Sequence, residues 1–255
     1  MIQPQLSVVG AGPGDPDLIT LKAIKAIASA NVILYDALVN EVLLAYASPH
    51  AELIFVGKRK GCYAYQQEQI NELIVKRALK YGHVVRLKGG DPFIFGRGAE
   101  ELEYVQPFGI ATQVVPGISS SAAVPAYQGI PLTKRGASES FWVITGTTKA
   151  HQISSDIALA AQSTATVVIL MGMGKLSEIV QVFSKEGKAE TAIAIIQNGT
   201  RTDEKVGIGT IRTIEHIVTQ KQLSSPAIII IGDVVKQRVL LNAISHEVFT
   251  KPISA

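Results

Sequence analysis

The chain has 255 residues, of which 47% are hydrophobic and 18% are charged, an ordinary composition for a globular protein. Its net charge of +3 is too small to indicate a nucleic-acid or membrane partner by itself. The single cysteine, Cys62, excludes an internal disulfide and any metal site built from several cysteines.

Targeting and membrane signals are weak at the sequence level. Gln3, Pro4 and Gln5 interrupt the pattern of a signal peptide. The longest apolar runs, near 166–173 and 227–231, are far shorter than the roughly 18 residues that a membrane span needs. We therefore expect a cytoplasmic protein. The length allows one large domain or two domains of roughly 100–130 residues.

In the first half of the chain, short β-branched runs alternate with helical stretches. The expected strands are Leu6–Gly10, Val32–Leu34, Leu53–Val56, Val84–Leu87 and Gln113–Val115, and the expected helices are Leu18–Ala30, Gln66–Tyr81 and Gly98–Phe108. Such alternation indicates parallel strands joined by helical crossovers.

The pattern restarts after GIPLTKRG (129–136). The expected strands there are Ser140–Thr145, Thr166–Met171, Ala192–Gln197 and Pro226–Gly232, with helices near His151–Gln162, Leu176–Lys185 and Ile211–Gln222. We therefore predict an α/β protein with mainly parallel sheets and two domains, 1–133 and 134–255. A cleft between the two domains is the natural place for a ligand.

The first strand ends in a glycine-rich loop, GAGPGDP (10–16), that fits neither familiar phosphate-binding pattern. It lacks the Gly-Lys-Ser/Thr ending of a P-loop, and its third glycine comes one position too early for a dinucleotide fingerprint. Pro13 removes a backbone donor and Asp15 adds negative charge, so a pyrophosphate is disfavoured. The structural alternative is a tight turn with Asp17 capping the next helix.

A second glycine-rich exit, KGGDPFIFGRG (88–98), is more specific. Gly89 and Gly90 let a ligand approach the backbone closely, and Asp91 offers acceptor oxygens to an ammonium or hydroxyl group. Arg97 and Glu100 are three residues apart and can share one helix face. The alternative for this pair is a surface ion pair worth under about 1 kcal/mol.

Further candidates follow other strand ends. Small residues from Ser119 to Ala123 allow something bulky to lie against a helix, and Asp36 faces the cleft or caps the next segment. The basic residues Lys58-Arg59-Lys60 and Lys134-Arg135 are solvated surface or converge on a polyanionic substrate. The five histidines show no pair at metal-ligand spacing, so no metal is expected.

Taken together, these motifs resemble the tetrapyrrole methyltransferases over nearly the whole chain. The matching stretches, in chain order, are VGAGPGDPDLITLKA, LYD, VGKR, VRLKGGDPFIFGRGAEE, VVPGISS, GIPLTKRG, ITGT, LMGM, QNGT and SPAIIIIGDVV. The resemblance implies S-adenosylmethionine as methyl donor, with S-adenosylhomocysteine as product. It also implies methylation of uroporphyrinogen III at positions 2 and 7 to precorrin-2, for cobalamin or sirohaem biosynthesis. The alternative is a sibling methylase that acts on a later precorrin.

The resemblance further implies a homodimer and assigns residues to the site. The cofactor is expected to contact Pro13, Gly89, Gly90, Asp91, Ser119, Ser120, Met171, Ala194 and Ala227. Arg97, Glu100 and Asp36 are the expected catalytic residues, although an arginine is normally locked in its protonated form and suits a carboxylate anchor better than a base. Lys58, Arg59, Lys134 and Arg135 are the expected contacts to substrate carboxylates. No nucleic acid or membrane is expected as a partner.

Two positions depart from the family pattern on the substrate side. Ala37 stands where many relatives have arginine after the LYD aspartate, and Cys62-Tyr63 replace a basic residue and histidine. Two other classes of protein compete with the methyltransferase. A nucleotide-dependent dehydrogenase is disfavoured by Pro13 and the displaced third glycine, and a non-catalytic tetrapyrrole carrier would bind the macrocycle without transferring a methyl group.

Overall fold

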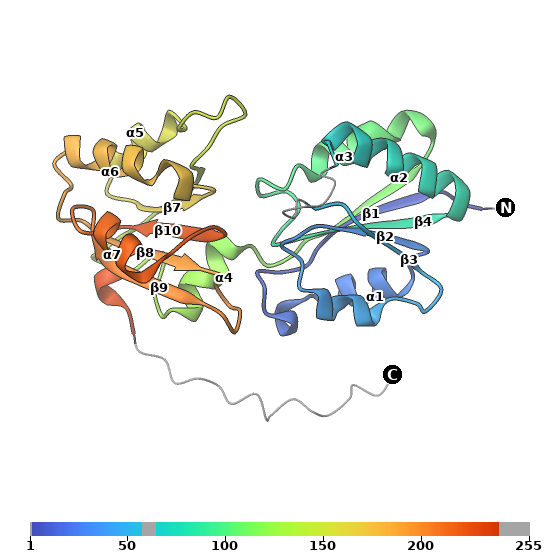
Figure 1. Ribbon diagram of the computed structural model, residues 1–255, viewed down its shortest axis with the longest axis horizontal. Helices are drawn as coiled ribbons and strands as arrows, with labels where there is room; N and C mark the ends of the chain where they lie inside the picture. Colours follow the sequence, from blue (N-terminus) through green and yellow to red (C-terminus); the bar gives the residue numbers. More distant parts are fainter. Residues whose placement is uncertain (1, 58–64, 240–255) are drawn as a thin grey trace.

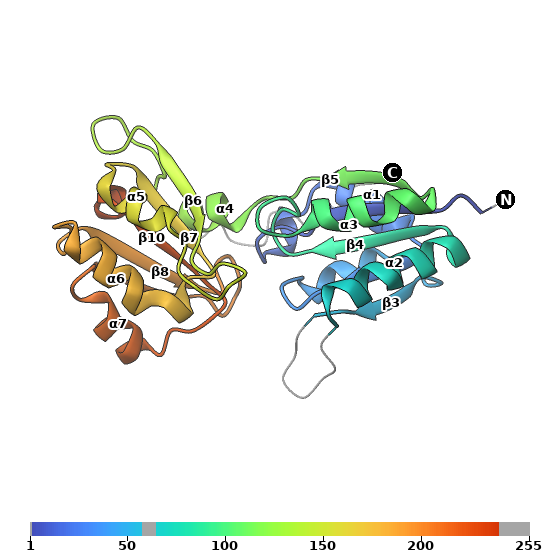
Figure 2. The ribbon, with the colours of Figure 1, turned by 90° about the horizontal axis from the view of Figure 1, so that it is seen from above.

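The computed structural model describes residues 2–57 and 65–239. The chain forms two α/β halves that lie side by side, each built on its own five-stranded sheet (Figures 1 and 2). The α/β class expected from the alternating pattern is confirmed.

The first sheet is wholly parallel, as the alternation predicts. Its strands run in the order β3-β2-β4-β1-β5, with every neighbouring pair parallel. Their bounds are β1 (Gln5–Gly10), β2 (Val32–Tyr35), β3 (Glu52–Phe55), β4 (His83–Lys88) and β5 (Ala111–Val115).

Helices cover both faces of this sheet (Figure 1). On one face, α1 (Leu21–Ala28) and the 3₁₀ helix η2 (Glu41–Tyr46) pack against Val9, Val85 and Leu87. On the other face, α2 (Gln67–Tyr81) and α3 (Gly98–Val105) pack against Leu6, Val8 and Val84. Successive side chains along a strand therefore enter opposite cores, as the two-residue period of a strand requires.

The helices after β1 are capped by residues other than the expected Asp17. Asp15 accepts a hydrogen bond from the backbone N–H of Asp17 and caps the short 3₁₀ helix η1 (Pro16–Leu18). Thr20 then caps α1 by accepting from the N–H of Ala23 at 3.1 Å. The prediction of Asp17 as cap is wrong, because the helix begins four residues later.

The second sheet is mixed, so the prediction of mainly parallel strands is right for the first sheet and wrong for the second. Its order is β6-β7-β10-β8-β9, and only β6 and β7 pair in parallel. The strands are β6 (Phe141–Thr145), β7 (Thr166–Leu170), β8 (Ala192–Gln197), β9 (Lys205–Thr210) and β10 (Ala227–Ile231). Strand β9 was not among the strands predicted from the sequence. A short loop rather than a helix joins it to β8, so the two strands pair antiparallel.

Two layers of helix enclose the second sheet. One face carries α5 (Asp156–Gln162), α6 (Leu176–Lys185) and α7 (Ile214–Lys221), whose apolar side chains surround Ile169, Ile195 and Ile229. The other face carries α4 (Ser120–Tyr127) and the 3₁₀ helix η5 (Asp233–Gln237). Two further 3₁₀ turns are η3 (Gln106–Phe108) and η4 (Met173–Lys175).

The position of α4 bears on the domain boundary. Val124 and Ile130 precede residue 134, yet both are buried in one core with Ile196 and Ile230 of the second sheet. We therefore propose that the second domain begins at α4, earlier than the predicted boundary. In a hydrogen-exchange experiment, the amides of α4 are expected to exchange together with those of β8 and β10; exchange together with the first sheet would contradict this boundary.

Candidate active site

The topology of the first sheet points to one place for a ligand. The chain leaves β4 towards α3 on one face of the sheet, whereas it leaves the neighbouring strands β1 and β2 towards α1 and η2 on the other face. The crevice at such a switch point, beyond the carboxyl ends of the strands, is where open α/β sheets bind ligands. Both glycine-rich exits predicted from the sequence end in this crevice.

The two exits are joined by their backbones. Gly90 N–H donates to the carbonyl of Gly12 at 2.7 Å, and Gly12 N–H donates to the carbonyl of Gly90 at 3.2 Å. The end of β5 is equally close, since a Cβ on Gly117 would lie 2.3 Å from the Gly90 oxygen and 2.8 Å from Gly10 Cα. These glycines are therefore needed for strand ends to approach one another, as well as for a ligand to approach them.

A cavity of about 580 Å³ opens at this switch point, and we call it the central cavity. Residues of the first half line it from the exits of β1, β2 and β4, and residues of the second half close it from α4 and the ends of β7, β8 and β10. The predicted residues among its lining are Pro13, Asp36, Gly89, Gly90, Asp91, Arg97, Ser119, Ser120, Met171 and Ala227.

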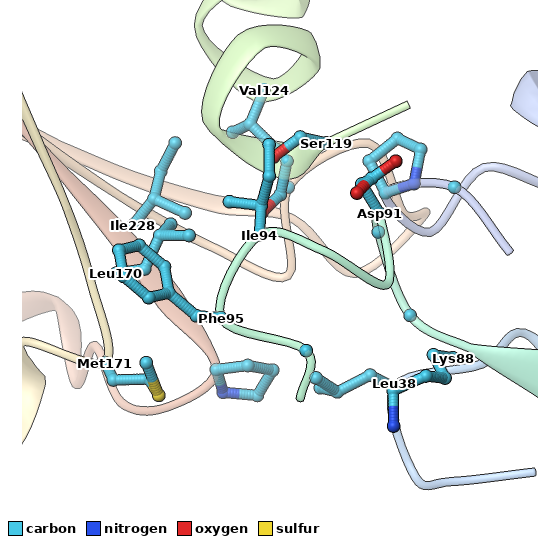
Figure 3. Close-up of a pocket in the computed structure, with 18 of the residues that line it drawn as sticks. Leu38, Lys88, Asp91, Ile94, Phe95, Ser119, Val124, Leu170, Met171 and Ile228 are labelled. Carbon is cyan, nitrogen blue, oxygen red and sulfur yellow. The ribbon is translucent and has the colours of Figure 1, made fainter. Parts of the chain in front are cut away.

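Asp91 is held in a fixed orientation at this cavity (Figure 3). One carboxylate oxygen accepts from the N–H of Phe93 at 2.8 Å, and the other accepts from the N–H of Gly117 at 3.0 Å. Each oxygen keeps a further lone pair for a ligand. Asp91 thus offers a preorganised acceptor for a cationic group.

Apolar side chains form the opposite wall. Figure 3 shows Ile94 and Phe95 reaching from the loop after β4 towards Val124 and Leu170 of the second half. Ile94 and Phe95 are 40% and 44% exposed, and Met171 is 53% exposed. Such accessible apolar surface beside a fixed carboxylate suits a ligand with one charged end and one apolar or aromatic end.

Several residues around the cavity adopt the left-handed backbone conformation that side chains rarely take. Phe95, Arg97, Met171 and Asn198 have φ between +51° and +60°, and all four line the cavity. Unfavourable backbone conformations of this kind concentrate at functional sites, where the surrounding structure maintains them.

Arg97 and Glu100 form the predicted ion pair, with Nε 3.0 Å from Oε1. Both side chains are about half exposed, at 52% and 53%, which also fits the surface-pair alternative. The hydrogen bond to Glu100 raises the pKa of Arg97, and the same bond lowers the pKa of Glu100. Arg97 therefore remains a cation at the cavity wall. Glu100 is not among the lining residues.

A buried ionic cluster under the cavity was not predicted from the sequence. Arg86 and Lys88 on β4 and Glu101 on α3 are almost fully buried, and Arg86 also approaches Asp36 with Nη2 3.4 Å from Oδ2. The signal was present, because charged residues at alternate positions of an otherwise apolar strand place both on one buried face. Asp36 also accepts from the N–H of Leu38 in its own turn, whereas Asn40 caps the next helical segment, η2, so the prediction of Asp36 as its cap is wrong.

Some predicted residues lie away from the central cavity, and others are outside the part of the chain that the structure describes. Ala194 is fully buried in the core between the second sheet and α4, because it lies in the middle of β8. Lys134 and Arg135 line a separate cavity of about 350 Å³ with Thr133, Ser138 and Glu139. Lys58 and Arg59, with Cys62 and Tyr63, lie outside the described residues.

Some lining residues were not predicted from the sequence. Asn198 and Gly199 belong to the QNGT motif (197–200) at the end of β8, and Arg201 directly follows it. Within residues 2–57 and 65–239, no three His, Cys, Asp or Glu side chains gather in a way that could hold a metal ion. No helix in the described part of the chain has the length and apolar character to cross a bilayer.

Comparison with known proteins gives consistent results. Residues 5–215 match the family described as Tetrapyrrole (Corrin/Porphyrin) Methylases. The chain is 44% identical over 230 residues to the uroporphyrinogen-III C-methyltransferase of Methanocaldococcus jannaschii, covering 89% of this chain and 95% of that protein. It is 48% identical over 231 residues to the enzyme of the same name from Priestia megaterium, with 89% and 97% covered.

A solved structure agrees in fold. The uroporphyrin-III C-methyl transferase of Thermus thermophilus complexed with S-adenyl homocysteine superimposes with a TM-score of 0.79 at 34% identity, covering 91% of this chain and 99% of that one. The chain also matches siroheme synthases, of which it spans about half the length.

Proposed function

Because the chain belongs to the tetrapyrrole (corrin/porphyrin) methylase family, we propose that it is an enzyme that methylates uroporphyrinogen III at positions 2 and 7, with S-adenosylmethionine as donor, to give precorrin-2. The observation that carries this proposal is the central cavity at the switch point, where both glycine-rich exits meet a fixed carboxylate and an apolar wall. Relatives named for the same reaction match almost the full length of the chain.

The central cavity fits the donor by size and by the chemistry of its lining. Asp91 would hold the ammonium of the methionine part, and its two backbone hydrogen bonds keep the carboxylate in place. Ser119 and Ser120 supply hydroxyl groups, while Pro13, Met171 and Ala227 supply apolar contacts beside them. When bound there, S-adenosylmethionine supplies an electrophilic methyl group to the reaction.

The acceptor carries eight carboxylates, which cationic residues around the cavity would bind. Arg97 is the best placed, since it lines the cavity and Glu100 keeps it protonated. Arg201 lines the same cavity from the second half. Each charge-assisted hydrogen bond to a carboxylate contributes about 1.5–3 kcal/mol. Lys58, Arg59, Lys134 and Arg135 remain proposed contacts for the outer carboxylates.

Methyl transfer requires mainly that the donor and the acceptor be correctly positioned. An electron-rich pyrrole carbon must lie in line with the methyl group, and holding two reactants in this geometry contributes much of the rate of such a reaction. The apolar wall formed by Ile94, Phe95 and Met171 is suited to the flat faces of the pyrrole rings. Asp36 at the exit of β2 completes the proposed catalytic group with Arg97 and Glu100.

The product would enter cobalamin or sirohaem biosynthesis, and we propose that the enzyme works in the cytoplasm as a homodimer. The family resemblance supports the dimer, and the absence of a described membrane-spanning helix agrees with a cytoplasmic location. Light scattering of the purified protein tests the assembly: a mass of twice the chain is expected, and a mass of one chain would contradict it.

The decisive assay uses S-adenosylmethionine with a labelled methyl group and uroporphyrinogen III. The expected product carries two labelled methyl groups, as determined by mass spectrometry. Recovery of unmodified macrocycle, in the presence of donor that a reference methyltransferase can use, would refute the function. Methylation of a later precorrin, with uroporphyrinogen III left unchanged, would identify the sibling activity instead.

A further inference from the structure

The buried cluster beneath the central cavity contains a lysine for which the proposed function has no role. Lys88 is the last residue of β4, immediately before the Gly89-Gly90 turn, and its side chain is only 6% exposed. Because strand side chains alternate, Lys88 shares a face with Arg86 and Val84, beneath the N-terminal turns of α2 and α3. Lys88 also lines the central cavity. It is therefore buried by protein on one side and open to the site on the other.

Glu101 organises this cluster with a single oxygen. Its Oε1 accepts from Lys88 Nζ at 2.8 Å, Arg86 Nε at 3.2 Å and Gln67 Nε2 at 3.2 Å. Its Oε2 is buried and has no hydrogen-bond partner. A buried carboxylate with an orphaned oxygen is a costly arrangement. It retains unused capacity to stabilise a cation beside it.

The charges around Lys88 favour a proton acceptor. Arg86 on the same strand is permanently protonated, Glu101 and Glu100 face Lys88 from α3, and Asp36 faces it from the exit of β2. Burial lowers the pKa of Lys88, and the neighbouring Arg86 lowers it further, against the opposing effects of Glu101 and Asp36. With Lys88 uncharged, the group of Arg86, Asp36 and Glu101 carries one net negative charge. Uptake of a proton by Lys88 neutralises that charge.

We propose that Lys88, in its uncharged form, accepts the proton that the macrocycle must release after each methylation. This inference rests on the proposed function. The S–CH₃ bond of the donor would break with its electron pair staying on sulfur, and the new carbon–carbon bond would leave the macrocycle with one positive charge. A C–H or N–H bond of the macrocycle then breaks, its electron pair returns to the ring system, and the proton binds to the lone pair of Lys88 Nζ. The resulting ammonium is held by Glu101 and returns its proton to solvent before the next cycle.

Arg97 cannot take this role, because its pKa is raised by Glu100 and the guanidinium has no lone pair to offer. The same property makes arginine the most informative replacement for Lys88. Lys88→Arg reproduces the charge of a protonated lysine and can still donate a hydrogen bond to Glu101, but it cannot be deprotonated at accessible pH. A lysine that serves only as a charge tolerates this change, whereas a proton acceptor does not.

The experiment compares wild type, Lys88→Arg and the control Lys175→Arg, which alters a surface lysine paired with Glu178. Lys88→Arg is expected to bind S-adenosylhomocysteine like wild type in calorimetry but to form precorrin-2 about a hundredfold more slowly or worse. The rise of the wild-type rate with pH is expected to vanish in Lys88→Arg and to persist in Lys175→Arg. An active wild type with an equally active Lys88→Arg overturns the role of Lys88. Absence of methylated product from wild type overturns the proposed function itself.

A second readout does not depend on turnover. In wild-type protein with ¹³C-labelled lysine and no ligand, one Cε resonance is expected to titrate at lower pH than those of the surface lysines. That resonance disappears in Lys88→Arg, which assigns it. If every lysine titrates together, the inference is wrong. If urea titration shows that Lys88→Arg does not fold, the double variant Lys88→Met/Glu101→Gln takes its place, because it removes both charges together. It is expected to bind S-adenosylhomocysteine without turnover. Normal turnover by this double variant would likewise refute the inference.

Discussion

The strand-end contact at Gly117 provides the sharpest test of how the site is built. A methyl group at this position, introduced as Gly117→Ala, would lie 2.3 Å from the carbonyl oxygen of Gly90 and 2.8 Å from Gly10 Cα. Both neighbours are backbone atoms, which cannot rotate away as the end of a side chain can. An ordinary contact needs about 3.5 Å, so the chain must open by about 1 Å.

The cost follows from what that opening disrupts. Overpacking of a tight site costs about 1–3 kcal/mol. Displacement of Gly90 also weakens its two hydrogen bonds to Gly12, each worth about 0.5–1.5 kcal/mol. We therefore expect Gly117→Ala to lower the free energy of unfolding by about 2–5 kcal/mol. The N–H of Gly117 moves with it, so Asp91 loses one of the donors that fix its carboxylate.

Urea unfolding followed by circular dichroism measures the stability, and calorimetry measures the affinity for S-adenosylhomocysteine. The control is Gly174→Ala, where an added methyl group meets nothing within 4 Å and a change within about 0.5 kcal/mol is expected. Gly117→Ala is expected to bind the ligand at least about tenfold more weakly, equivalent to about 1.4 kcal/mol. A Gly117→Ala protein as stable and as tightly binding as the control would refute the close-approach argument.

Three further predictions concern contacts elsewhere in the structure. Gly199→Ala places a methyl group 2.4 Å from a methyl carbon of Val124 and is expected to cost about 1–3 kcal/mol in urea unfolding; Val124→Ala in the same chain should recover part of that loss, and no recovery would contradict the contact. Burial lowers the pKa of His83, so its contribution to stability is complete above the unfolded value of about 6.5 and is lost as pH falls below it. The free energy of unfolding should therefore fall less between about pH 7.5 and about pH 5.5 in His83→Asn than in wild type. An equal fall in both proteins would refute this. Arg97→Ala is expected to raise the KM for the tetrapyrrole about tenfold or more without changing the affinity for S-adenosylhomocysteine; an unchanged KM would exclude Arg97 as a carboxylate anchor.

The first half of the fold was predictable because its signals are local. Each parallel strand is a short β-branched run that ends in glycine or a turn residue, and each crossover helix lies between two such runs. In the second half, β9 escaped prediction because Gly207 and Gly209 interrupt its pattern. The structure explains both glycines, since an added methyl group would collide with Leu223 or Ile217. Packing of α7 on β9 is a tertiary requirement that no local pattern shows.

The residues of the candidate site likewise fall into those that local motifs predict and those that only the fold brings together. Asp91, Ser119 and Arg97 were identified because each follows a strand end with a recognisable motif, and all three line the central cavity. The buried cluster was not predicted because Glu101 lies in α3, the helix after the strand that carries Arg86 and Lys88. Only the packing of α3 on the sheet brings the three side chains together. Ala194 was assigned to the cofactor site from the family resemblance, but it lies in the middle of β8 and its side chain is buried in the core. Local motifs identify where strands end. Which side chains face one another depends on the order of the strands in the sheet, which local motifs do not show.

The path of the chain between its two halves has a consequence for how ligands act on the protein. The described chain crosses from the first sheet to α4 once, over the few residues after β5, and Gly117 in that crossing donates to Asp91 while Ser119 and Ser120 follow it into the cavity wall. The connection between the two halves and one wall of the central cavity are thus the same segment. A ligand held by Asp91 and Ser119 would bind to this connection, so its affinity would be thermodynamically linked to the angle between the halves. Mutations that change that angle would then change binding even where they touch no ligand, and binding would in turn restrict the angle.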